Sequence, residues 1–154
     1  MVYVAKIMRG AKGWRAEFPD VRGCSVEART EAEIVALATR ALSDFLRWQV
    51  RAGPGLAPHR HYRGPGPAIE VEGALALAIQ LREARTDSCL STRELGERAG
   101  VGSHVVEQLE AALTVATLAC VLPIAKVLGM RPVIEPERPG EAVGLTKGKR
   151  WPGW

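Results

Sequence analysis

The stretch FPDVRGC, residues 18–24, decides how the first half of this chain is expected to fold. Immediately before it, apolar and charged side chains alternate with the period of a half-buried strand, over Trp14, Arg15, Ala16, Glu17 and Phe18. Pro19 then removes a backbone donor, and Asp20 and Gly23 are residue types that favour turns. The stretch therefore predicts the end of one strand and a turn that leads to the next.

Strands are expected on both sides of this turn. Residues 2–9 and 13–18 predict a hairpin that closes through the glycines of residues 10–13. Residues 24–28 predict a third strand, whose apolar residues alternate with polar ones and share one face. Much later in the chain, residues 69–71 predict a short edge strand that returns to the sheet.

A long helix is expected between the third strand and the edge strand. Thr30 and Glu33 have the spacing of a capping box, and Gly53 marks the end of the helical pattern. The apolar stripe expected to cover the sheet consists of Ile34, Ala38, Ala41, Phe45 and Trp48. A loop rich in glycine, proline, histidine and arginine follows and extends to residue 67.

The second half of the chain has the pattern of short helices. Residues 75–85 predict one helix, and the capping box of residues 91–94 starts a second. The Gly-Val-Gly sequence of residues 100–102 predicts a tight turn, after which Ser103 is expected to cap a third helix. A fourth helix is expected over about residues 117–128. Two short helices joined by such a turn indicate a helix-turn-helix.

Composition excludes several classes of protein. With 154 residues, 47% hydrophobic and 25% charged, the chain fits two small globular domains. Three cysteines without a C-x-x-C pair, Cys24, Cys89 and Cys120, argue against a disulfide framework or a zinc site. The longest apolar run, residues 113–125, is too short to span a membrane, and we expect a cytoplasmic protein.

The positive charge of the chain is unevenly distributed. Residues 1–66 hold eleven Lys or Arg against six Asp or Glu, whereas residues 74–130 hold five against six. The basic surplus therefore lies in the first half and in the sequence KGKRW near the end. A pI near 9.3 is compatible with binding to nucleic acid.

Two sequence stretches resemble one protein family. FPDVRGC followed by EARTEAEIVALATRALSDFL resembles the N-terminal half of HicB antitoxins, and LSTRELGERAGVGSHVVEQLEA is similar to the Xre-type helix-turn-helix that many of them carry. The resemblance covers roughly residues 2–130. It implies an α+β fold, in which a partial ribonuclease-H-like β-β-β-α-β domain over residues 1–72 precedes an all-α helix-turn-helix domain over residues 73–134. Residues 135–154 are expected to form a flexible tail, although residues 132–134 have a strand pattern at its start.

The same resemblance implies a function. HicB-like proteins are antitoxins of type II toxin-antitoxin systems: they neutralise a HicA-like toxin that degrades messenger RNA, and they bind operator DNA to repress their own operon. A homodimer or higher homo-oligomer is expected, because helix-turn-helix proteins place two copies on a palindromic site. The alternative is a solitary HicB-like transcriptional regulator or protein-interaction module without a toxin partner.

Candidate binding residues fall into two sets. The toxin-binding set around the opening stretch contains Trp14, Phe18, Pro19, Asp20 and Arg22. The DNA-binding set contains Thr92, Arg93, Ser103, His104, Glu107 and Gln108.

Catalytic and metal sites are not expected. Glu17, Asp20 and Asp44 could be imagined as the carboxylates of a metal-dependent nuclease, but their spacing does not bring them together. His59 and His61 lack a third metal ligand and are interpreted as exposed loop residues. We expect no enzyme activity and no cofactor.

Glu107 has two opposite interpretations. A carboxylate on the second helix of the helix-turn-helix repels phosphates, so it is either a tolerated charge or an acceptor for a cytosine amino group. The second helix has no Lys or Arg to anchor it, which favours the first interpretation.

Overall fold

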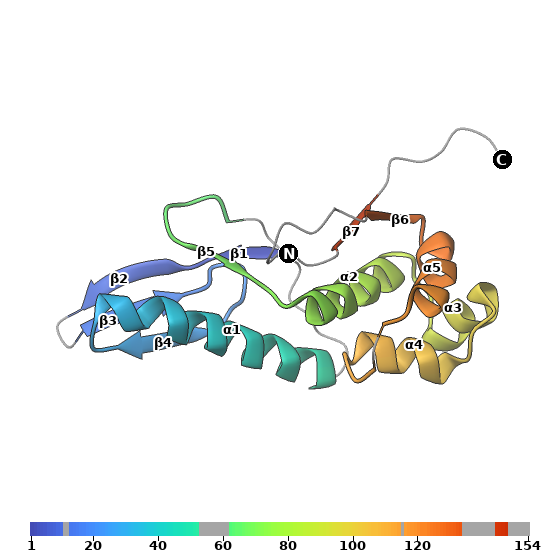
Figure 1. Ribbon diagram of the computed structural model, residues 1–154, viewed down its shortest axis with the longest axis horizontal. Coiled ribbons are helices and arrows are strands. Elements are labelled where there is room, and N and C mark those ends of the chain that lie inside the picture. Colours follow the sequence, from blue (N-terminus) through green and yellow to red (C-terminus); the bar gives the residue numbers. More distant parts are fainter. Residues whose placement is uncertain (11–12, 53–61, 115, 134–143, 148–154) are drawn as a thin grey trace. The chain divides into compact units, whose positions relative to one another are not determined.

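The computed structural model is an α+β protein whose chain divides into two compact units, Met1–Glu72 (unit 1) and Gly73–Trp154 (unit 2) (Figure 1). The structure describes residues 1–10, 13–52, 62–114, 116–133 and 144–147. The predicted hairpin turn at residues 11–12, the two loop histidines, and residues 135–143 and 148–154 of the predicted tail lie outside the described residues. Among the described helices, none has both the length and the apolar character that crossing a bilayer requires.

The described residues of unit 1 form five short strands in two antiparallel sheets. They are β1 (Val2–Val4), β2 (Lys6–Gly10), β3 (Gly13–Glu17), β4 (Ser25–Ala28) and β5 (Ala68–Glu70). The order β2-β3-β4 forms one sheet, and β1 pairs with β5 in the other, with Tyr3 opposite Ile69. The single strand predicted over residues 2–9 is therefore wrong. It breaks at the buried Ala5, whose N–H donates to the carbonyl of Pro67 at 3.0 Å rather than to a β3 residue.

Helix α1 (Glu31–Ala52) begins at the predicted capping residue, since the Glu33 N–H donates to the Thr30 hydroxyl at 3.4 Å. Its buried positions recur every four residues: Ile34, Ala38, Leu42, Leu46 and Val50. Only the first two belong to the predicted stripe, and Trp48 is 63% exposed. Each four-residue step turns about 40° beyond a full turn of a 3.6-residue helix, so the buried line winds around α1. This winding is the pattern expected for a helix that lies on a twisted sheet.

In the part of unit 2 that the structure describes, the chain forms four helices and one strand pair. They are α2 (Gly73–Asp87), α3 (Thr92–Ala99), α4 (Ser103–Glu110), α5 (Leu118–Val127), β6 (Met130–Val133) and β7 (Gly144–Lys147). Leucine, valine, isoleucine, alanine and methionine side chains from α2 to β6 form one buried core. β6 and β7 are antiparallel, with Met130 opposite Lys147. β7 lies within the segment that the sequence assigned to a tail.

Candidate nucleic-acid and protein interfaces

The start of α3 is held by a complete capping box. The Ser91 hydroxyl accepts from the Glu94 N–H at 3.1 Å, and the Ser91 N–H donates to the Glu94 carboxylate at 2.8 Å. The hydrogen bonds that the Ser91 N–H and the Ser91 hydroxyl donate to the ionised carboxylate lower the pKa of the Glu94 carboxyl. The predicted capping box is confirmed, and it fixes the first residue of α3.

The end of α3 turns sharply into α4. Gly100 adopts the left-handed conformation with φ +68°, and the Val101 N–H donates to the Gly96 carbonyl at 2.9 Å. A Cβ added at the buried Gly96 would lie 2.9 Å from the Val101 oxygen and 3.1 Å from the Ser103 nitrogen. Both neighbours are backbone atoms that cannot rotate away, so only glycine permits the turn to approach α3 this closely.

Ser103 does not have the predicted capping role. The residue at the N-cap of α4 is Gly102, and no side chain caps this end, because α4 itself starts at Ser103. The Val105 and Val106 N–H groups donate to the Gly102 carbonyl instead. The Ser103 side chain, half-buried, lies in the first turn of the helix.

The two faces of α4 differ sharply. Val106 and Leu109 are buried in the core together with Leu95 of α3. The exposed face carries His104, Glu107 and Gln108, which lie at helical spacings of three and four residues. All three belong to the predicted DNA-binding set.

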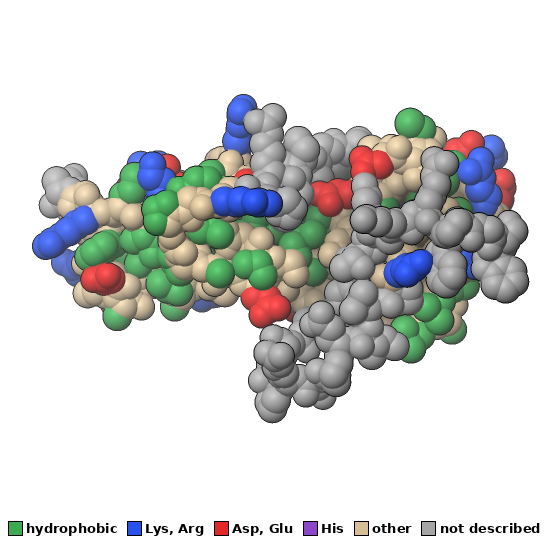
Figure 2. All heavy atoms as spheres, turned by 90° about the horizontal axis from the view of Figure 1, so that it is seen from above, with side chains coloured by type: hydrophobic (Ala, Val, Ile, Leu, Met, Phe, Trp, Pro, Cys, Tyr) green, Lys and Arg blue, Asp and Glu red, His purple; other side chains and the backbone are tan. Residues whose placement is uncertain are grey.

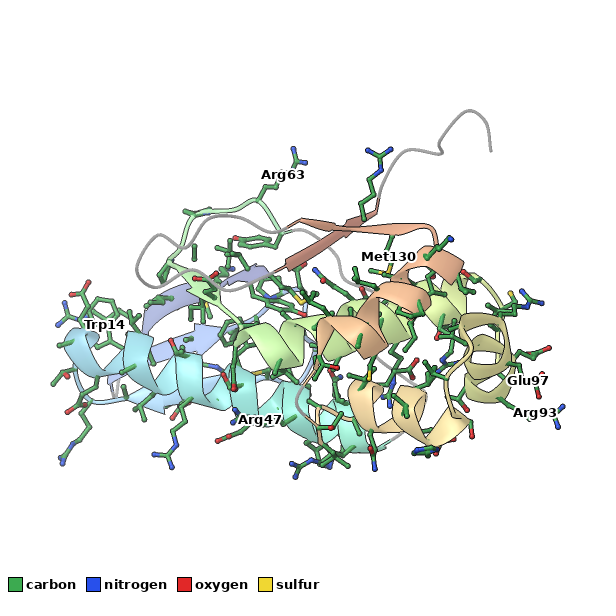
Figure 3. The ribbon with its side chains drawn as sticks, turned by 45° about the vertical axis from the view of Figure 1, so that its right-hand side comes forward. Trp14, Arg47, Arg63, Arg93, Glu97 and Met130 are labelled. Atoms are coloured by element: carbon green, nitrogen blue, oxygen red, sulfur yellow. The ribbon has the colours of Figure 1, made fainter. Side chains whose placement is uncertain are left out.

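The two remaining residues of that set lie at the start of α3. Thr92 is half-buried, and its hydroxyl donates to the Glu107 carboxylate at 3.2 Å, which joins the start of α3 to the exposed face of α4. Arg93 is exposed and lies 3.7 Å from Glu97, and Figure 3 shows both side chains pointing away from the helices. The hydrogen bond between Thr92 and Glu107 therefore joins Thr92 and the exposed face of α4 into one surface.

A buried ion pair behind this surface was missed by sequence reasoning. Glu110, 2% exposed, accepts from Arg85 at 2.6 and 2.8 Å, and Arg82 approaches it at 3.5 Å. The hydrogen bonds that Arg85 donates to the Glu110 carboxylate raise the pKa of Arg85. The spacing in the sequence indicates the burial of Glu110, since it follows the inward Val106 by four residues and so lies on the same face of the helix.

The stretch FPDVRGC, residues 18–24, forms a loop that is held in place by its buried side chains. Phe18, Val21 and Cys24 are buried at three-residue intervals. Three backbone hydrogen bonds link them, from Phe18 N–H to Cys24, from Val21 N–H to Phe18 and from Cys24 N–H to Val21, at 3.0 to 3.2 Å. Gly23 has φ +88°, and burial raises the pKa of the Cys24 thiol to about 11. The interruption between β3 and β4 is thus a packed loop rather than a simple turn.

The predicted toxin-binding residues are placed differently from one another. Phe18, 3% exposed, is a core residue and offers no surface to a partner, so its assignment to the toxin-binding set is wrong. The apolar alternation of the strand continues to Phe18 and places its side chain on the buried face. Both Asp20 carboxylate oxygens accept from the Tyr62 N–H, at 3.0 and 2.9 Å. Pro19 and Arg22 are exposed. Trp14 is half-buried, with the Arg9 guanidinium 5.9 Å from its ring centroid.

The surface of unit 1 mixes apolar and basic side chains. In the left half of Figure 2, hydrophobic and Lys or Arg side chains lie close together on one face of this unit. Glu17 and Asp44 do not converge with Asp20: Glu17 pairs with Arg15 at 2.9 Å, and Asp44 lies 3.9 Å from Arg47. Among the described residues, no group of three or more His, Cys, Asp or Glu side chains is arranged to hold a metal ion.

Comparison with known proteins adds no relative. A scan against protein-family models finds no match to this chain, and a search of curated proteins finds no similar sequence.

Proposed function

We propose that unit 2 binds double-stranded DNA, with α3, the turn and α4 acting as a helix-turn-helix. The observation that carries the proposal is the close approach of the turn to Gly96, which fixes the angle at which α4 leaves α3. In a helix-turn-helix the second helix enters the major groove, and the first crosses the backbone. α4 presents His104, Glu107 and Gln108 for base contacts, and the start of α3 presents the Thr92 backbone N–H and the Arg93 side chain for phosphate contacts.

The biological role that follows is that of an antitoxin and autorepressor. The resemblance of residues 18–46 to HicB proteins supports a partial ribonuclease-H-like unit 1 that binds a HicA-like, RNA-cleaving toxin, and a homodimer that binds a palindromic operator. On unit 1 the exposed loop residues Pro19 and Arg22, with the half-buried Trp14, are the contacts we propose for the toxin. Asp20 contributes by holding the loop rather than by touching the partner.

DNA binding is tested by fluorescence anisotropy with the full chain. Duplex DNA from upstream of the gene and a scrambled duplex are titrated at two salt concentrations. We expect the upstream duplex to bind about 10³-fold more tightly or better, as specific sites generally do. Arg93→Ala should weaken binding to both duplexes and reduce the salt dependence, whereas Arg40→Ala, which removes an exposed charge from unit 1, should leave both affinities and the salt dependence unchanged. Equal affinity for the two duplexes would contradict the proposal.

Toxin binding is tested by co-expression with short open reading frames that lie beside the gene. A cognate toxin should arrest growth alone and be neutralised by the full chain. Arg22→Glu should abolish neutralisation, because it reverses a charge on the proposed contact loop, and Arg40→Glu on α1 serves as the matched control. If Arg22→Glu still neutralises as well as wild type, this loop is not the contact.

A second candidate function is a protein-interaction module without DNA binding. It is favoured by the charge of the candidate interface: α4 contains no Lys or Arg, and Arg93 is paired with Glu97. The anisotropy titration separates the two functions, because a module of this kind shows no preference for the upstream duplex.

A further inference from the structure

The two glutamates of α4 have opposite environments. Glu110 is buried and accepts from Arg85, so its charge is compensated within unit 2. Glu107 is exposed, and among the described residues no Lys, Arg or His forms an ion pair with it. Its hydrogen-bond donor is the neutral hydroxyl of Thr92. Unlike Glu110, Glu107 therefore lies on the exposed face of α4 without an ion-pair partner among the described residues.

Thr92 also restricts how the Glu107 side chain is oriented. A free glutamate on a helix surface samples many rotamers, and ordering it on binding costs conformational entropy. The Thr92 hydroxyl engages Oε1 at 3.2 Å, and within the described part of the chain no further donor is bonded to Oε2. The carboxylate is thus positioned before any ligand arrives, with one oxygen open to accept.

The chemistry of the major groove selects what this oxygen accepts. Only the amino groups of cytosine and adenine are donors on the base edges there. Adenine presents its N7 acceptor beside the amino group, and a carboxylate has no donor to offer it, whereas cytosine presents the amino group alone. An ionised carboxylate is therefore matched to cytosine.

We propose that Glu107, positioned by Thr92, is a specificity residue that accepts a hydrogen bond from a cytosine amino group and so selects a G·C pair in the DNA site. This inference rests on the proposed DNA-binding function. It replaces the interpretation of Glu107 as a tolerated charge. Under that interpretation the hydrogen bond from Thr92 would have no part in recognition. The attraction to phosphates comes from the start of α3 rather than from Glu107. The Glu107 carboxylate lowers the affinity for DNA in general and increases the preference for one sequence.

The experiment begins with the full chain and a pool of randomised duplexes. Sequences that bind are selected, and affinities are measured for the selected site and for versions in which each C·G pair is replaced by A·T. For wild type we expect one position at which this replacement weakens binding about 5- to 150-fold, which is the range of one good base contact. Glu107→Gln should bring the ratio of the affinities for C·G and A·T at this position to about one or invert it, since a glutamine amide pairs with adenine. Ratios at the other positions should not change.

Three further variants separate the orientation of the Glu107 carboxylate from its charge. Thr92→Val, which keeps the shape of the side chain but removes its hydroxyl, should lower the ratio at the same position severalfold, while Thr92→Ser retains it. Glu97→Gln removes an exposed carboxylate from α3 and should strengthen binding to all duplexes alike without changing any ratio. Circular dichroism should show that each variant is folded, because every substituted side chain lies at the surface or is half-buried.

The possible failures are distinguishable. If wild type selects no preferred sequence, DNA recognition and this inference are both overturned. If wild type selects a sequence but Glu107→Gln changes its affinity for all duplexes by the same factor, DNA binding stands and the specificity role of Glu107 is overturned.

Discussion

The Arg85 guanidinium and the Glu110 carboxylate form a two-point ion pair inside unit 2. Arg85 Nε lies 2.6 Å from Glu110 Oε1 and Arg85 Nη2 lies 2.8 Å from Oε2, while Nη1 donates to the Leu90 carbonyl at 2.8 Å. The pair joins the last turn of α2 to the last residue of α4, and it also fixes the chain between α2 and α3. The exposed face of α4 therefore depends on a buried contact at its opposite side.

Removing one partner of this pair should destabilise unit 2. Glu110→Ala leaves the Arg85 guanidinium largely buried without a carboxylate, and we expect a loss of about 3 kcal/mol in the free energy of unfolding, at the low end for a broken buried pair. Urea unfolding followed by circular dichroism measures it. The double variant Arg85→Met with Glu110→Leu should recover most of the loss, because no buried charge of the pair is left uncompensated. A loss below about 1 kcal/mol in Glu110→Ala, within the range of an exposed pair, would contradict the buried role.

Gly96→Ala should disrupt the junction of α3 and α4. The added Cβ meets backbone atoms of Val101 and Ser103 at 2.9 and 3.1 Å, so the turn must move. We expect about 1–3 kcal/mol of destabilisation, typical of overpacking, together with weaker binding to the selected DNA site. Gly100→Asn is the matched control: a Cβ there has nothing within 4 Å, and asparagine tolerates the left-handed conformation. Equal effects of the two substitutions would show that the close approach at Gly96 is unimportant.

Asp20→Ala should loosen the chain where it leaves the loop before β5. Both carboxylate oxygens accept from the Tyr62 N–H, and alanine offers no acceptor. Hydrogen exchange of the Tyr62 amide should accelerate about tenfold, which corresponds to about 1.4 kcal/mol. Asp44→Ala, which removes an exposed carboxylate from α1, should leave that amide unchanged. Unaltered exchange in Asp20→Ala would exclude the hydrogen bond as a tether.

Local features of this fold were accessible from the sequence, whereas features set by distant partners were not. The Ser91–Glu94 capping box depends on four neighbouring residues, and the structure has it where the sequence predicts it. The Thr30 cap at the start of α1 is similar. The buried line of α1 depends instead on the twist of the sheet beneath it, so Trp48 was wrongly assigned to the core.

Two further differences between the sequence predictions and the structure also arise from partners that are distant in the sequence. The break at Ala5 depends on a hydrogen bond to Pro67, which lies more than sixty residues away in sequence. The burial of Glu110 depends on Arg82 and Arg85 of another helix, and hydrophobic periodicity treats a carboxylate as an outward residue. At the candidate DNA interface, residue identities were predicted, but the hydrogen bond between Thr92 and Glu107 was not, because a propensity pattern carries no side-chain orientation.

The capping box should make the stability of unit 2 depend on acidic pH. Hydrogen bonds from the Ser91 N–H and hydroxyl lower the pKa of the Glu94 carboxyl below its ordinary value of 4.5 in the folded state. A lowered folded pKa means that the unfolded state binds the proton first, so the stabilisation is present above pH 4.5 and is lost as the pH falls through the folded value. Urea unfolding at intervals from about pH 7 to about pH 3 should therefore show wild type losing more stability than Glu94→Gln, which cannot titrate there. Ser91→Ala removes the hydroxyl but keeps the backbone donor, so its loss should be intermediate. Parallel pH profiles for the three proteins would show that the capping box does not couple α3 to protonation.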